Sequence, residues 1–241
     1  MKSPCPISKN NINSLNSSIL KLTNQQIDTI NETLVLNGLV YDDIKLELVD
    51  HIASEIELAM DRKEVLFEEA LKTAFSNWQG QLQPSTSFWI WSESVPKIII
   101  LKSLKMVKHI LLMSFALGIL TAGAVTFIFK FNPQQEILLA LNNMLQAVSA
   151  LGISLIIYLR FKLWQSKHKS TYSFLFNRNG FIQVITLIML ATGLFNFRGY
   201  SNFSDFHFMS ALLPITWLFI SGFYLNVGFQ HLRFEKKLSK L

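Results

Sequence analysis

The stretch ILLMSFALGILTAGAVTFIF, residues Ile110–Phe129, decides the architecture of this chain. It is a run without any formally charged residue, and about 20 apolar residues suffice for a helix to cross the hydrocarbon layer of a membrane. The residues before it are predominantly acidic and the residues after it predominantly basic. The stretch therefore predicts a boundary between a water-soluble N-terminal part and a membrane-embedded C-terminal part.

The composition agrees with this division. Hydrophobic residues make up 50% of the 241 residues, which is high for a soluble domain of this size. Residues 1–96 carry 7 Lys/Arg and 13 Asp/Glu, a net charge of −6, whereas residues 97–241 carry 15 and 3, a net charge of +12. The basic residues fall between apolar segments, so they indicate the ends of membrane helices, and we expect no direct binding of nucleic acid.

Three further apolar segments follow, at about 137–159, 181–197 and 208–229, and the third of the four spans is short for a membrane crossing. Cations gather before the first span, between the second and third, and after the fourth, while the other two connections are nearly neutral. Because cytoplasmic loops carry the excess of Lys and Arg, this alternation predicts a multi-pass protein of the cell inner membrane with both termini in the cytoplasm.

The N-terminal part reads as helical. Residues 1–19 are rich in Ser and Asn and are expected to be disordered. Residues 20–80 predict three short helices, at about 24–37, 42–62 and 66–78, the first opened by a capping box of Thr23 and Gln26. Residues 81–108 predict a linker and a basic juxtamembrane helix. The aromatic cluster FWIW (residues 88–91) is expected at the membrane interface, in preference to packing under the bundle or lining a ligand pocket.

The expected fold class is therefore all-α, with a small cytoplasmic three-helix bundle (residues 20–80) followed by a four-helix transmembrane domain (residues 109–241) and its basic tail. Cys5 is the single cysteine, which excludes an intramolecular disulfide and a cysteine metal cage.

The segments YDDIKLELVDHIASEIELAM (Tyr41–Met60) and FEEALKTAF (Phe67–Phe75) resemble the N-terminal module of an uncharacterised family of bacterial membrane proteins. Their helices are also similar to the HAAS-type domain, which is found beside membrane segments and is often encoded next to PadR-like transcription regulators. The resemblance covers residues 20–78. It implies a regulatory or sensory role and assigns no active site.

One face of the second predicted helix is acidic and offers candidate binding residues. Glu47, His51 and Glu55 are spaced to form one stripe, and such side chains are able to ligate a metal or to sense pH. A stripe on one straight helix lacks a complete ligand set, so the favoured interpretation is structural or partner-facing, and we expect no cofactor. The candidate partner-binding residues are Asp43, Glu47, Asp50, His51 and Glu55.

The spans hold no deeply placed Asp, Glu, Lys or Arg, which argues against proton-coupled carriers and ion pumps. The intramembrane polar candidates are Asn142, Gln146 and Asn226, for which hydrogen bonding between helices is favoured over a ligand site. Two pairs of small residues, Gly118 with Ala122 and Ala150 with Ser154, predict close approach of helices.

The favoured function is a non-enzymatic membrane regulator or sensor that presents its acidic bundle to a cytoplasmic partner such as a transcription regulator. The bundle is also expected to dock on the basic loop of residues 160–180, and a homo-oligomer is compatible with its small core. The alternative is a small membrane transporter or a channel component. An enzyme is not expected, because the histidines His109, His168, His207 and His231 have no evident catalytic partners in the sequence.

Overall fold

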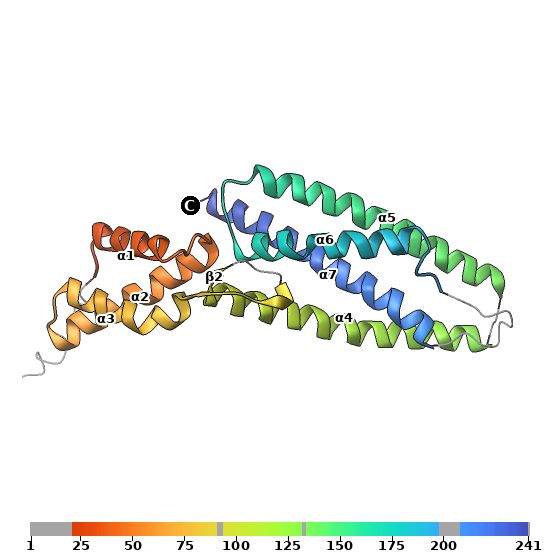
Figure 1. Ribbon diagram of the computed structural model, residues 1–241, viewed down its shortest axis with the longest axis horizontal. Coiled ribbons are helices and arrows are strands. Elements are labelled where there is room, and N and C mark those ends of the chain that lie inside the picture. Colours follow the sequence, from red (N-terminus) through yellow and green to blue (C-terminus); the bar gives the residue numbers. More distant parts are fainter. Residues whose placement is uncertain (1–20, 91–93, 132–133, 198–207, 241) are drawn as a thin grey trace, which may run out of the picture.

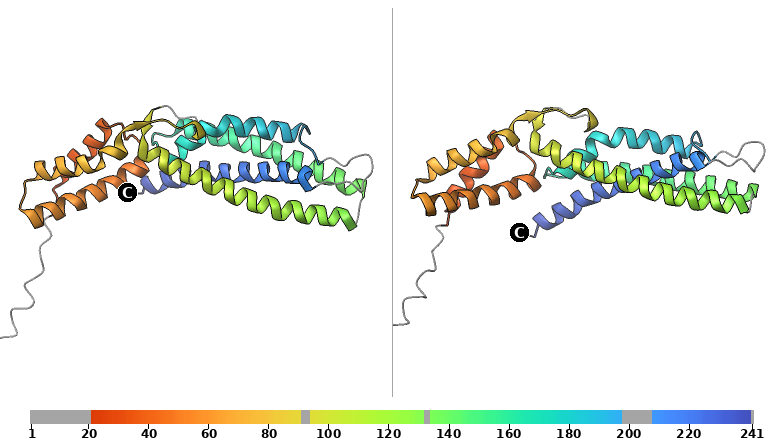
Figure 2. Two further views of the ribbon diagram at one scale, coloured as in Figure 1. Left: turned by 60° about the horizontal axis from the view of Figure 1, so that its bottom comes forward. Right: turned by 90° about the horizontal axis from the view of Figure 1, so that it is seen from below.

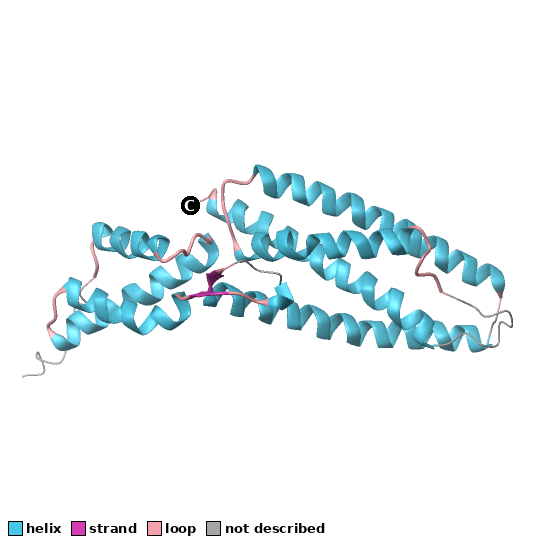
Figure 3. Cartoon of the chain, viewed as in Figure 1, coloured by secondary structure: helices cyan, strands magenta, loops and turns pink. Residues whose placement is uncertain are grey.

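The computed structural model describes residues 21–90, 94–131, 134–197 and 208–240. The predicted disordered segment, Cys5, Trp91 and His207 lie outside these described residues. The described chain is almost entirely helical (Figure 3). In chain order the helices are α1 (Asn24–Leu36), α2 (Asp42–Lys63), α3 (Phe67–Leu82), the 3-10 turn η2 (Phe88–Ile90), α4 (Lys97–Phe131), α5 (Gln135–Gln165), α6 (Thr171–Ala191) and α7 (Phe208–Leu238).

Helices α1–α3 lie at one end of an elongated molecule, and α4–α7 run alongside one another at the other end (Figure 1). The capping-box prediction is confirmed. The Thr23 side chain accepts the Gln26 backbone N–H, and the Gln26 side chain accepts the Thr23 backbone N–H. Gly38 then turns the chain with a positive φ of 81°, which glycine adopts without strain.

The face of α2 opposite its acidic stripe is apolar and buried. Leu48, Ile52 and Ile56 are all inaccessible, and they pack with Ile30 and Leu34 of α1. Helix α3 covers α2 from the other side and continues through Gly80 to Leu82, four residues beyond the predicted end. The helix boundary therefore follows packing rather than the weak local signal of one glycine.

A short hairpin leads into the membrane-sized helices. Strands β1 (Pro84–Ser85) and β2 (Val95–Pro96) pair antiparallel, with Pro84 opposite Pro96. Within the aromatic cluster Ile90 is buried and Phe88 is 83% exposed, while the side chain of Trp89 is not described. Of the described side chains, Phe88 alone keeps the exposure that the predicted interfacial role requires.

Four helices, α4, α5, α6 and α7, are each long and apolar enough to cross a membrane. The 35-residue α4 joins the predicted juxtamembrane helix and the first span without interruption, as expected. Large apolar side chains such as Leu112, Phe115, Leu120 and Ile157 remain exposed on the outside of this part. An apolar outer surface of this extent is typical of contact with lipid.

The predicted bounds of the third span are wrong. The expected segment was 181–197, but α6 begins at Thr171 and ends at Ala191. The Ser170 side chain accepts the Ser173 backbone N–H and starts the helix ten residues early, and Gly193, with φ 77°, follows its end. The predicted loop of residues 160–180 is accordingly reduced to a connection of residues 166–170 between α5 and α6.

Small residues set the packing of the four long helices. Ser114, Gly118 and Ala122 form a buried stripe on α4 that faces α7, which confirms the prediction for Gly118 and Ala122. The prediction for Ala150 and Ser154 is wrong, because both are exposed. On α5 the close approach is made instead at Gly152, which packs against Leu187 of α6.

Replacing Gly118 with alanine tests the α4–α7 contact. A Cβ atom at Gly118 overlaps the Thr216 hydroxyl and lies 3.2 Å from the Thr216 Cβ atom, so the two helices must separate. We expect Gly118→Ala to reduce the free energy of unfolding by about 1–3 kcal/mol and to lower the Tm of thermal unfolding in detergent.

Gly123→Ala is the matched control on the same helix, because a Cβ atom there meets nothing within 4 Å. The control should keep or slightly raise the Tm, since alanine favours a helix over glycine by about 1 kcal/mol. Equal Tm values for the two variants would contradict the proposed role of Gly118.

Candidate functional site

The candidate site is a cluster of polar side chains where the start of α2 meets the α5–α6 connection, the start of α6, and the adjoining ends of α4 and α7. We call it the polar junction. In both views of Figure 2 the ribbons of these segments meet where α1–α3 adjoin the four long helices. Its members are Asp42, Asp43, Glu47, Lys102, Ser166, His168, Ser170, Thr171, His231 and Glu235.

Asp42 fastens the first turn of α2 to the α5–α6 connection. Its backbone N–H donates to the carbonyl of Lys169 at 2.8 Å. Its carboxylate Oδ2 lies 3.1 Å from His168 Nδ1, and its Oδ1 lies 3.1 Å from the Lys45 ammonium. Because the first N–H groups of a helix have no partner within it, a loop carbonyl satisfies one of them here.

Asp43 caps a second helix. Its Oδ1 accepts the backbone N–H of Thr171, the first residue of α6, at 2.8 Å. A carboxylate at a helix N-terminus is favoured by both the free N–H groups and the helix dipole. The other oxygen lies 3.5 Å from the Lys102 ammonium of α4, which also contacts Glu47 at 3.3 Å. The Asp43 side chain, only 7% exposed, thus joins α2, α4 and α6.

His231 forms the buried base of the junction. It is fully buried on α7, just beyond the apolar segment of residues 208–229. Its Nδ1 lies 2.8 Å from Ser170 Oγ and its Nε2 lies 3.2 Å from Ser166 Oγ, which in turn donates to Glu235 at 2.9 Å. With Ser166 donating to Glu235, the neutral imidazole donates from Nε2 to Ser166 and accepts from the Ser170 hydroxyl.

Burial lowers the pKa of His231 because a charged imidazolium would lose its hydration. The neighbouring carboxylates of Glu235 and Asp43 oppose this lowering, and His168 adds to it. Ser170 and His231 form a serine–histidine contact, but both side chains are 0% exposed. A nucleophile must reach its substrate, so the contact is suited to holding the start of α6 rather than to catalysis.

The residues of the predicted acidic stripe have separate environments. Glu47 pairs with Lys102, and Glu55 accepts hydrogen bonds from Asn77 at 2.7 Å and from the Trp78 indole at 3.2 Å. His51 is exposed and stacks on Trp78 with ring centroids 6.5 Å apart. Within the described residues, no group of three His, Cys, Asp or Glu side chains is placed to hold a metal ion.

Asp50 is exposed and lies outside the polar junction. Of the five candidate partner-binding residues, the fold therefore brings only Asp43 and Glu47 together, through Lys102. Asp50 and His51 remain at the surface, one turn or more along α2.

The intramembrane polar candidates do not converge. Asn142 exchanges hydrogen bonds with the backbone of Phe197, at 2.9 and 3.3 Å, and Gln146 packs against Gly193. Asn226 is exposed on α7, away from both. The bond between Gln183 of α6 and Ser221 of α7, at 3.0 Å, is of the interhelical kind that the sequence predicted for such residues.

Sequence reasoning missed much of the polar junction. His231 has no evident partner in the sequence, whereas the structure buries its ring between Ser166 and Ser170. One local signal was present, because Ser170 and Ser173 have the spacing of a helix cap. The contacts of Asp43 and His231 with Thr171 and Ser170 join residues far apart in the chain, which no local pattern reveals.

No family model, curated protein or solved structure matches this chain. The resemblance of Tyr41–Met60 and Phe67–Phe75 to a membrane-protein family therefore stays a prediction.

The buried imidazole makes the polar junction sensitive to acid. In the unfolded chain His231 takes up a proton near its ordinary pKa of about 6.5, whereas burial lowers its pKa in the folded chain. The unfolded state thus binds more protons as the pH falls below about 6.5, and the free energy of unfolding decreases there. We expect His231→Gln to reduce the fall in Tm between about pH 7.5 and about pH 5.5.

His109→Gln is the control for removing an imidazole, because His109 is exposed on α4. A full acid-induced fall in Tm in His231→Gln, equal to that in the control, would rule out His231 as its source.

Proposed function

We propose that this chain is a non-enzymatic regulatory or sensory membrane protein, in which α1–α3 form a cytoplasmic domain held on the membrane part by the polar junction. The four long apolar helices support the membrane assignment. Residues 1–96 have a net charge of −6 and residues 97–241, from the start of α4 onward, a net charge of +12. These opposite charges support an electrostatic attraction between the two parts.

The distribution of cations supports a cytoplasmic position for both termini. The start of α4, the α5–α6 connection and the end of α7 lie at the end of the four-helix part that is nearest α1–α3 (Figure 1). This end carries Lys102, Lys105, Lys108, Lys162, Lys167, Lys169, Lys236 and Lys237. An excess of Lys and Arg at one set of helix ends is typical of the cytoplasmic face.

The observation that carries the proposal is the capping of α6 by Asp43 of α2. A single largely buried carboxylate satisfies the start of one long helix and contacts Lys102 of another. Any movement of α4 relative to α6 changes the distance between these two partners of Asp43. A change in the membrane part is thereby transmitted to the position of α2.

The docked arrangement leaves part of the acidic face free for a partner. Asp43 and Glu47 are engaged with Lys102, whereas Asp50 and His51 are exposed. We assign these two exposed residues to partner recognition, and a transcription regulator remains the class of partner that the family resemblance implies.

The transporter or channel alternative finds less support. A polar path needs side chains that line it together, and Asn142, Gln146 and Asn226 lie in separate surroundings.

Crosslinking in the full chain tests the docked state. In a Cys5→Ser background, Lys45 and Lys169 are each replaced by cysteine. Lys45 lies one turn from Asp42 on α2, and Lys169 is the residue whose carbonyl accepts the Asp42 N–H. A short bifunctional maleimide that joins the two cysteines reports docking. We expect Asp43→Lys to lower the crosslinking yield about fivefold or more, because it leaves the Thr171 N–H and Lys102 without their acceptor.

Asp50→Lys is the matched control, with the same change of charge on an exposed residue of the same helix. It should leave the crosslinking yield unchanged. An equal fall in both variants would indicate a general effect of charge and would reject the specific docking.

The regulatory role is tested with the same full-length variants, crosslinked to their neighbours in membranes of the source cell. We expect Asp43→Lys to change the capture of a cytoplasmic partner, because α2 is released, and Asp50→Lys to reduce capture without affecting docking. Equal capture by wild type and by Asp43→Lys, while the crosslink between positions 45 and 169 is lost, would refute regulation through the junction. A reporter fused after Leu241 should be active in the cytoplasm, since the tail is basic.

A further inference from the structure

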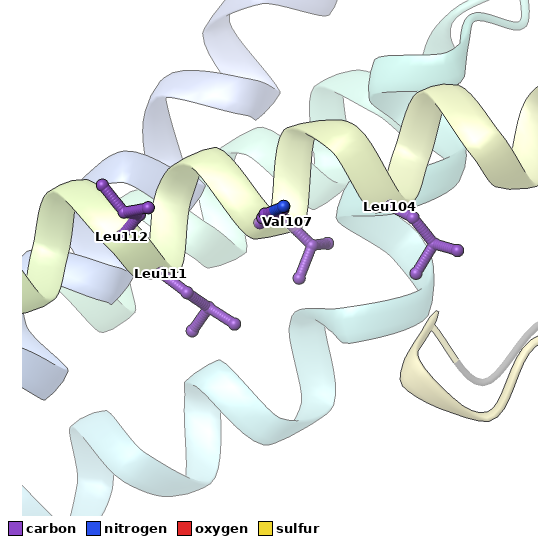
Figure 4. A pocket seen from close by; sticks show the side chains of 5 residues that line it. Leu104, Val107, Leu111 and Leu112 are labelled. Atoms are coloured by element: carbon purple, nitrogen blue, oxygen red, sulfur yellow. The ribbon is translucent and has the colours of Figure 1, made fainter.

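The first part of α4 lines a cavity that the polar junction does not use. The cavity has a volume of about 600 Å³ and is lined by Leu104, Val107, Lys108, Leu111 and Leu112. Leu104, Val107 and Leu111 point from α4 across a space toward α6 (Figure 4). Four of the five lining side chains are apolar, so the cavity suits a hydrocarbon rather than a polar ligand.

The cavity follows from the way the helices cross. Gly118 brings α4 and α7 close together, and the two helices diverge toward the end where α4 begins, as Figures 1 and 2 both show. Helix α4 also makes much less contact with α6 than with α7. One flank of α4 is consequently left uncovered by protein over the two turns that contain the lining residues.

Lys108 stands at the depth of the lipid headgroups. The chain between Lys108 and Lys130 spans about 33 Å as a helix, close to the thickness of a bilayer's hydrocarbon core. Side chains of a helix tilt toward its N-terminus, and a lysine near the membrane edge extends its ammonium toward the interface. Lys108 lines the cavity together with Val107 and Leu111, so a headgroup at this depth lies within reach of its ammonium.

The charge of Lys108 is not compensated within the described residues. Lys102 is engaged by Asp43 and Glu47, whereas Lys108 takes part in no described salt bridge. A cation that borders an apolar cavity at headgroup depth is complementary to a molecule with an anionic head and a hydrocarbon chain. A zwitterionic lipid such as phosphatidylcholine fills the apolar part equally well, but its choline cation offsets the charge of the phosphate that the ammonium would meet, so an anionic lipid binds more strongly.

We propose that the cavity along α4 binds an anionic phospholipid of the surrounding bilayer, whose phosphate pairs with Lys108 and whose acyl chain lies along Val107, Leu111 and Leu112. This site goes beyond the regulatory role. It requires that α4 crosses a bilayer, and it is independent of whether α2 docks or signals.

Retention of lipid by the full chain tests the site. The protein is taken from nanodiscs of equimolar phosphatidylglycerol and phosphatidylcholine into detergent, and bound lipids are counted by native mass spectrometry. We expect the wild type to retain one phosphatidylglycerol and Lys108→Gln to retain about fivefold less, which is the effect of removing one lysine at an anionic surface.

Lys105→Gln is the matched control, because Lys105 is an exposed lysine one turn away on α4 that does not line the cavity. It should retain the lipid as the wild type does. Leu111→Trp fills the cavity and should expel the lipid while Lys108 remains.

An equal loss of phosphatidylglycerol in Lys105→Gln and Lys108→Gln would overturn the proposal, since it would indicate general attraction to a basic surface. Equal retention of phosphatidylcholine and phosphatidylglycerol by the wild type would overturn it as well, because Lys108 would then select nothing. Neither result affects the crosslink between positions 45 and 169. The lipid site and the regulatory role are therefore tested independently, and either proposal can be rejected without the other.

Discussion

The bond between the Asp43 carboxylate and the Thr171 N–H is the constraint on which the arrangement of the chain depends. A long helix must satisfy the N–H groups of its first turn, and a largely buried carboxylate must find donors or cations. This one contact meets both needs, with Lys102 as the cation. The start of α2 is thereby fixed against α4 and α6, and the buried ring of His231 supports the same turn of α6 through Ser170.

The four long helices are organised by a different principle. In lipid, an apolar side chain gains little free energy by moving from the lipid tails to the surface of a neighbouring helix, because both surroundings are apolar. Close packing and polar contacts therefore decide which helices associate. Glycine provides the close packing: Gly118 lies against Thr216, Gly152 against Leu187, and Gly228 against Leu159 and Phe176. Helices α4 and α7 touch at Gly118 and diverge toward the end where α4 begins, and the polar junction lies at that end.

Local signals were sufficient for most helices and misleading for one. The capping box at Thr23 and the apolar period of α2 correctly predicted the first two helices, because both act within one or two turns of chain. The polar run of Asn177, Arg178 and Asn179 hid the start of α6. Helix α5 contacts this run, since the Arg160 guanidinium donates to the backbone carbonyl of Asn177 at 3.2 Å. A hydropathy pattern does not register such a contact, because it joins two helices.

The sequence by itself determined the all-helical character, the four apolar segments and the separation of acidic from basic residues. These properties depend on composition and on periods of a few residues. Only the tertiary structure decided which acidic side chains make contacts. Asp43 and Glu47 bind groups outside α2, and Glu55 accepts hydrogen bonds from α3. Asp50 remains exposed. The physical reason is that the free energy a charged side chain contributes depends on its burial and on its partners. Both are set by the folding of distant segments against one another.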